Sequence, residues 1–231
     1  MLAMAAIVPA MAMEMNVAGN QVIMTGRVES TDFNAFDELL RTQDRKIDTV
    51  ILKDSPGGDS WAGYKIGELI MSKKLYTAVA GYCMSACANI FLGGKERYFT
   101  DQTRQRPAVL GFHGSYYKIS HQLIPNKVER IRRWVWQQTG YRVDPTLVET
   151  WANIKRSGGA VYFFDPQLFK RWDGTSVMYC TGEESPGRLS QDCEGIYSGD
   201  AYNMNIVTSM QWVRVNEAGA PAPKGTGAAQ R

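Results

Sequence analysis

The sequence predicts an α/β fold built on a largely parallel sheet. Three observations support this: short apolar runs bounded by turn residues, amphipathic runs between them, and regular alternation of the two. Such alternation is typical of βαβ units, in which each connecting helix packs on the sheet. The 231 residues, 44% apolar and 21% charged, suffice for one domain with a sizeable core. The net charge of +3 gives no reason to expect a nucleic-acid partner.

Strands and helices alternate through the first half of the chain. Apolar and β-branched runs predict strands at residues 21–28, 48–52, 75–80, 97–100 and 108–112. Apolar residues three and four positions apart predict helices that begin at residues 30, 60 and 85. Pro56, Gly57 and Gly58 end the second strand, because proline cannot donate to a sheet and glycine permits unusual dihedral angles.

The second half is predicted to be a helical insertion followed by a C-terminal extension. Residues 120–157 have helical periodicity, with Arg130, Arg132 and Arg133 on a charged face that we expect to be solvated. Asp165-Pro166 predicts a second short helix over residues 165–172, and residues 206–215 predict a final strand.

The two ends of the chain are predicted to lie outside the single domain of residues 13–216. Residues 1–12 are apolar and close on Ala10-Met11-Ala12, as expected for the remnant of a secretory signal peptide. Residues 217–231 are rich in Ala, Gly and Pro and lack apolar periodicity, which predicts a disordered tail.

The four cysteines fit an exported protein. The simplest pairing joins Cys83 to Cys87 and Cys180 to Cys193, although four cysteines allow three pairings. Disulfides persist in oxidising compartments, so we expect a periplasmic or secreted location. With two histidines and no C-x-x-C motif, we expect no metal site, and no cofactor is implied.

Ser85 and His113 are candidates for acyl-transfer chemistry. This chemistry needs a nucleophile, a base and N–H donors aimed at the developing oxyanion. Ser85 is at the opening of a predicted helix, where the N–H of Ala86 has no helical partner, and Gly58 can present a second N–H. His113 follows a predicted strand and can be the base. Each feature alone has a structural explanation, as a helix cap, a turn or a buried ring.

The sequence around these residues resembles the Clp peptidase (ClpP) family, especially its exported bacterial relatives. The resemblance rests on D-S-P-G-G-D at 54–59, G-Y-C-M-S-A-C-A-N-I-F-L-G-G-K at 81–95 and L-G-F-H-G at 110–114. It covers residues 21–115 well and 160–178 loosely. It implies the ClpP/crotonase-like stack of ββα units.

The resemblance also assigns roles to the site residues. Ser85 is expected to be the nucleophile, His113 the general base, and Gly58 and Ala86 the oxyanion-hole donors. Family members carry an aspartate further along the chain, but Tyr162 occupies that position here. Asp165 is the nearest replacement, and the alternative is a Ser-His dyad.

The expected activity is cleavage of peptides or unfolded proteins. We expect no ATPase partner, because an exported protein has no ATP supply outside the cytoplasm and the sequence has no phosphate-binding loop. Homo-oligomers are compatible with the resemblance. Three further functions stay open: an inactive ClpP-like binding protein, a crotonase-like acyl-thioester enzyme, and a Ser-Lys hydrolase using Lys65 or Lys95. Cys83 or Cys87 could also be the nucleophile in place of Ser85.

Overall fold

The computed structural model describes residues 12–44, 46–101, 103, 105–185 and 189–216. The predicted signal remnant at 1–12, except Ala12, and the predicted tail at 217–231 lie outside the described residues. In chain order the elements are β1 (Glu14–Ala18), β2 (Gln21–Thr25), α1 (Asp32–Thr42), β3 (Thr49–Ser55), α2 (Ser60–Lys73), β4 (Tyr76–Met84), α3 (Ala86–Leu92), β5 (Arg97–Phe99), β6 (Val109–Phe112), η1 (Pro125–Lys127), α4 (Val128–Thr139), α5 (Pro145–Ala152), β7 (Ala160–Phe164), β8 (Val177–Cys180), α6 (Leu189–Asp192) and β9 (Glu194–Gly195).

The described strands form one nine-stranded sheet, in the order β1-β2-β3-β4-β6-β7-β8-β9 with β5 also paired to β4. The central pairs are parallel, namely β2–β3, β3–β4, β4–β5 and β4–β6. The flanking pairs are antiparallel. The α/β class is therefore confirmed, and the parallel pairing is confined to the centre of the sheet.

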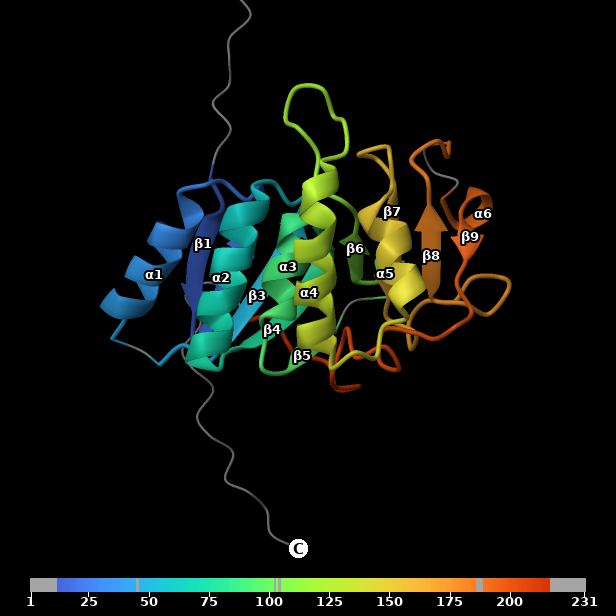
Figure 1. The fold of residues 1–231 in the computed structure, drawn as a ribbon. Helices are drawn as coiled ribbons and strands as arrows, with labels where there is room; N and C mark the ends of the chain where they lie inside the picture. Colours follow the sequence, from blue (N-terminus) through green and yellow to red (C-terminus); the bar gives the residue numbers. More distant parts are fainter. Residues whose placement is uncertain (1–11, 45, 102, 104, 186–188, 217–231) are drawn as a thin grey trace, which may run out of the picture.

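Helices α1 to α5 lie side by side over one face of this sheet (Figure 1). The main core lies between these helices and the strands, and it contains Phe36, Phe91 and Trp151, all fully buried. Burial of aromatic side chains of this size dominates the energetics of such a core. Helix α2 begins at Ser60 as predicted, and Asp59 caps it, because its carboxylate accepts a hydrogen bond from the Ala62 N–H at 2.8 Å.

The opposite face of the sheet is covered over its central strands by the end of the chain. Val213 and Val215 pack against a small cluster of Ile51, Ala78 and Ala80. The predicted strand at 206–215 is wrong except for a single bridge from Val213 to Thr100. This segment crosses the sheet face, so its alternating side chains pack on the sheet without extending a ladder.

One further local prediction is wrong. Residues 165–172 form turns with no helix, although one carboxylate oxygen of Asp165 accepts from the Gln167 N–H as a helix cap does; the other oxygen accepts from Trp212 Nε1. Strands β1, β7, β8 and β9 were not predicted; they are the antiparallel strands on either side of the parallel centre. The helical prediction over 120–157 corresponds to η1, α4 and α5.

Within the described chain, no helix has the length and apolar character needed to cross a bilayer.

Candidate active site

Ser85 occupies a sharp turn between β4 and α3. Its backbone has φ 56° and ψ −118°, a conformation that non-glycine residues rarely adopt. Such a residue costs about 1–3 kcal/mol and persists only where its surroundings hold it. The Ser85 N–H donates to Gly111 O at 2.8 Å, and the Ser85 carbonyl accepts from the Asn89 N–H at 3.1 Å. A strained strand-to-helix turn exposes the serine hydroxyl, as nucleophilic serines require.

The Cys83–Cys87 disulfide encloses this turn. The two cysteines flank Ser85 by two residues on each side, and both are fully buried. The bridge connects the end of strand β4 to the first turn of helix α3. It therefore restricts the backbone dihedral angles of the residues between Cys83 and Cys87. Because both sulfurs are bonded to each other, neither cysteine is available as a nucleophile, and the hypothesis of a cysteine nucleophile is wrong.

The Gly57-Gly58 turn packs directly against Ser85. A Cβ on Gly57 would lie 2.7 Å from Ser85 Cβ and 2.4 Å from Met84 O, so only glycine fits there. Gly58 forms a parallel bridge with Val28, in which Gly57 O accepts from the Val28 N–H and the Asp59 N–H donates to Val28 O. Successive peptide groups in an extended segment point to opposite sides.

The N–H groups of Gly58 and Ala86, the expected oxyanion-hole donors, are both left unpaired by this arrangement among the described residues. The Gly58 N–H points away from Val28, and Ala86 is the first residue of α3. Neither N–H has a hydrogen-bond acceptor among the described residues. Ala86 N would lie only 3.0 Å from a Cβ on Gly57, which places it beside the glycine turn. Two unpaired donors beside a serine hydroxyl have the geometry that stabilises a tetrahedral intermediate.

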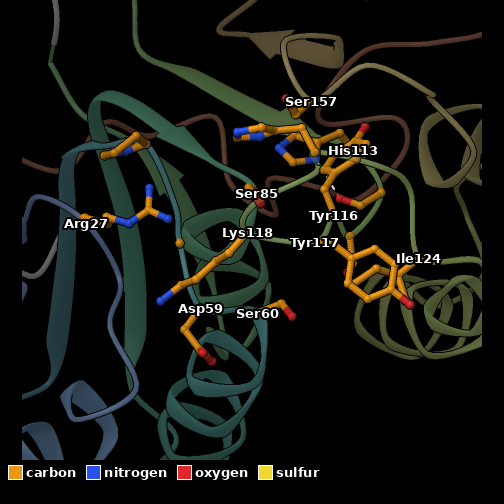
Figure 2. Close-up of a pocket in the computed structure, with 15 residues that line it drawn as sticks. Arg27, Asp59, Ser60, Ser85, His113, Tyr116, Tyr117, Lys118, Ile124 and Ser157 are labelled. Atoms are coloured by element: carbon orange, nitrogen blue, oxygen red, sulfur yellow. Dashed lines mark hydrogen bonds between the residues drawn. The ribbon is translucent and has the colours of Figure 1, made fainter. Parts of the chain in front are cut away.

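The sheet register brings His113 next to Ser85. Strands β4 and β6 are parallel, with Met84 opposite Gly111, so Ser85 extends toward the end of β6 that His113 follows. Ser85 and His113 line the same cleft, which has a volume of about 410 Å³ (Figure 2). No hydrogen bond joins the two side chains in this structure. Such bonds are often long before substrate binds and tighten in the substrate complex.

A backbone carbonyl orients the His113 ring. Nδ1 lies 2.6 Å from Gly114 O, so it carries the proton and donates it, leaving Nε2 able to accept. The ring of Tyr116 packs against it with centroids 5.1 Å apart. Burial lowers the pKa of His113, and the Gly114 carbonyl partly offsets this effect. The neutral ring, which is the form that acts as a base, is therefore favoured.

No carboxylate in the described part of the chain contacts the His113 ring. Strands β6 and β7 are antiparallel, with Phe112 opposite Val161 and Val109 opposite Phe164. Asp165 therefore lies past the far end of β6, about 16 Å along the strands from His113 at about 3.3 Å per residue. The hypothesis that Asp165 orients His113 is wrong.

Three other residues considered as partners of Ser85 or His113 lie elsewhere: Tyr162, Lys65 and Lys95. Tyr162 pairs with Gly111 and packs near the Cys180–Cys193 bridge. Lys65 forms an ion pair with Glu68 on α2, and Lys95 lies over the Tyr76 ring. Neither lysine lines the cleft, so the Ser-Lys hypothesis in that form is wrong.

Several cleft residues were not predicted from the sequence. The cleft is lined by Arg27, Pro56, Gly58, Asp59, Ser60, Ser85, His113, Gly114, Ser115, Tyr116, Tyr117, Lys118, His121, Ile124 and Ser157. Most of the new members come from the segment after β2 and from the loop after β6; Ser157 comes from the connection between α5 and β7. The only signal in the sequence was the position of the polar run S-Y-Y-K shortly after His113.

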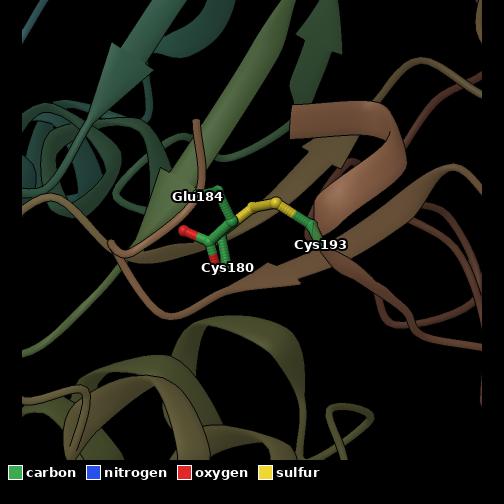
Figure 3. A group of neighbouring side chains, drawn as sticks. All are labelled: Cys180, Glu184 and Cys193. Atoms are coloured by element: carbon green, nitrogen blue, oxygen red, sulfur yellow. A yellow bond between two sulfur atoms is a disulfide. The ribbon is translucent and has the colours of Figure 1, made fainter. Parts of the chain in front are cut away.

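The predicted Cys180–Cys193 disulfide is present, and it excludes a metal site that its surroundings would otherwise suggest. Glu184 lies beside the two cysteines (Figure 3). Metal binding requires thiolates, whereas these sulfurs are bonded to each other. The Glu184 carboxylate already accepts from the N–H groups of Thr181 and Gly182. The group closes a loop between β8 and β9.

Comparison with known proteins finds solved structures of similar fold, and the three described below are peptidases. No family model and no curated protein matches the chain. ClpP1 from Listeria monocytogenes is 14% identical over 86% of this chain and 92% of its own, with a TM-score of 0.47. A mutant of that ClpP1 is 21% identical over 56% and 77%, with a TM-score of 0.43. A mutant of the 1510-N membrane-bound stomatin-specific protease is 16% identical over 57% and 67%, with a TM-score of 0.41.

Proposed function

We propose that this protein is a serine hydrolase that cleaves peptide bonds through an acyl-enzyme. The observation that carries the proposal is that Gly58, Ser85 and His113 line one cleft, with the unpaired N–H of Ala86 beside the glycine turn at Ser85. Each group is held by a different contact, and together they match what acyl transfer requires.

In the proposed reaction, Ser85 Oγ attacks the peptide carbonyl carbon while His113 Nε2 takes the hydroxyl proton. The carbonyl oxygen becomes an oxyanion and accepts hydrogen bonds from Gly58 and Ala86. His113 then gives its proton to the leaving amine, which leaves an ester on Ser85. A water molecule, activated by His113 in the same way, releases the acid and regenerates the serine.

The site works as a Ser-His dyad in this proposal. Gly114 O fixes the tautomer of His113, which is one of the two tasks of a triad aspartate. A neutral carbonyl stabilises the imidazolium less than a carboxylate does. We therefore expect slower catalysis than in a complete triad, with the same order of steps.

The proposal also covers the cellular location, the substrates and the partners of the enzyme. Two disulfides support an oxidising compartment, and we propose a periplasmic or secreted enzyme that needs no ATPase partner and acts on peptides or unfolded chains. Homo-oligomerisation is compatible with it. An inactive binding protein is the second candidate, favoured by the missing carboxylate at His113. Nothing in the cleft specifically favours an acyl-thioester enzyme.

Covalent labelling tests the proposal. Pure, oxidised protein is treated with a fluorophosphonate probe, and the labelled residue is identified by peptide mass mapping. We expect one label on Ser85, none in Ser85→Ala, and much slower labelling in His113→Gln. Wild-type protein that stays unlabelled while correctly folded would support the inactive binding protein instead.

A further inference from the structure

The side of the cleft formed by Arg27 and Lys118 carries excess positive charge. Arg27 follows β2 and Lys118 follows β6, and both line the cleft with Ser85. In Figure 2 they lie together on one side of Ser85, and His113 and Ser157 lie on the other. Among the described residues, the one acidic side chain that lines the cleft is Asp59, whose carboxylate accepts the Ala62 N–H at the start of α2.

Glu29 balances only part of this charge. Its Oε1 lies 3.1 Å from Arg27 Nε and its Oε2 lies 3.9 Å from Lys118 Nζ, so two cations share one carboxylate. The terminal guanidinium nitrogens of Arg27 have no partner among the described residues. A guanidinium carries five donors in a planar fork, and these remaining donors match the two oxygens of a carboxylate.

We propose that the cleft selects peptides that carry a carboxylate on one side of the scissile bond, bound by Arg27 and Lys118. The inference rests on the proposed hydrolase function, because it assigns the substrate class of the same site. Both cations lie on one side of Ser85, so the preference is confined to residues on one side of the bond. The carboxylate comes either from a Glu or Asp side chain or from the end of the peptide.

The strength of the preference follows from the exposure of these groups. The Arg27 side chain is 46% exposed and that of Lys118 is 71% exposed, so an added carboxylate stays partly solvated. Exposed ion pairs of this kind correspond to about a 1.4- to fivefold change in affinity. Screening by salt weakens them, so the preference should shrink between about 0.02 M and about 0.3 M salt.

Binding to full-length Ser85→Ala protein tests this without requiring turnover. Dye-labelled peptides that differ only in the position of a single Glu, each with a Gln counterpart, are titrated by fluorescence anisotropy. A second set has an amidated C-terminus, which separates the terminal carboxylate from the side chain. We expect Glu to tighten binding by about 1.4- to fivefold at one or two positions on one side of the peptide.

Two variants, each made in the Ser85→Ala protein, test whether Arg27 causes the preference for Glu over Gln. Arg27→Gln should reduce the Glu preference to near unity. Lys73→Gln removes the same charge at the far end of α2, on an exposed residue, and should leave the preference intact. Equal binding of Glu and Gln peptides at every position, with either C-terminus, overturns the inference, as does an unchanged preference in Arg27→Gln.

The two proposals fail separately in these experiments. Labelling of Ser85 in wild type combined with no carboxylate preference refutes the inference and leaves the hydrolase intact. A carboxylate preference that depends on Arg27, in a protein whose Ser85 is never labelled, refutes the hydrolase and supports an acidic-peptide binding cleft.

Discussion

The Cys83–Cys87 bridge is predicted to hold Ser85 in its reactive conformation. Its sequence separation of 4 closes a loop of five residues. The chain-entropy relation, −2.1 − 1.5R ln n, gives about −7 cal/mol/K for such a loop, or about 2 kcal/mol at 25 °C. This is comparable to the roughly 1–3 kcal/mol that a strained backbone such as that of Ser85 costs. Loss of the bridge therefore allows the turn to relax.

The double variant Cys83→Ala/Cys87→Ala should show this relaxation as slower chemistry. If the full ~2 kcal/mol acts on the turn, the fraction of molecules with a competent Ser85 falls by up to about 30-fold, since each 1.36 kcal/mol is a factor of ten. The assay is the rate of fluorophosphonate labelling of Ser85, followed by intact mass, together with the midpoint of thermal unfolding.

The second disulfide provides a matched control. Cys180–Cys193 has a separation of 13 and closes fourteen residues, which corresponds to about 3 kcal/mol by the same relation. Cys180→Ala/Cys193→Ala should therefore lower the unfolding midpoint more, yet change the labelling rate less. The reasoning is refuted if removing Cys83–Cys87 lowers only the unfolding midpoint and leaves labelling at the wild-type rate.

Two further predictions concern the base and the excluded acid. Burial lowers the pKa of His113, and the neutral ring is the base, so labelling of Ser85 should slow on acidification only below pH about 6.5. If the labelling rate instead falls with a midpoint above that pH, a carboxylate must lie near His113. Asp165→Asn should destabilise the fold by about 1–3 kcal/mol, through its buried bonds to Gln167 and Trp212, and leave the pH profile of labelling unchanged; a changed pH profile would reinstate Asp165 as a partner of His113.

Features that depend on neighbours in the chain were predictable. The turn after β3, the start of α2 at Ser60 and the helix that follows Ser85 all arise from residue types at short spacing. Both disulfides are local as well, and the simplest pairing is the one observed. The conclusion that Ser85 and His113 share a cleft also followed, because loops after parallel strands gather at one edge of the sheet.

Features that depend on strand register were not predictable. The run A-V-Y-F-F at 160–164, bounded by Gly-Gly and Asp-Pro, is a strand signal that was overlooked in the sequence, but nothing in the run shows that β7 pairs antiparallel with β6. That pairing determines that Asp165 lies at the opposite end of the strand from His113. Reversing the direction of a single strand moves a residue by the whole strand length, and no local pattern encodes the direction.

The sequence by itself determined the chemical parts of this protein: a serine at a helix opening, a glycine turn, a histidine at a strand end and two local disulfides. Only the tertiary structure decided which groups surround them. In the structure, the backbone oxygen of Gly114 contacts His113 Nδ1 where a carboxylate was expected. Arg27 and Lys118 both lie near the carboxylate of Glu29. The physical reason is that the positions of these groups are set by packing and strand register, which join segments far apart in the chain.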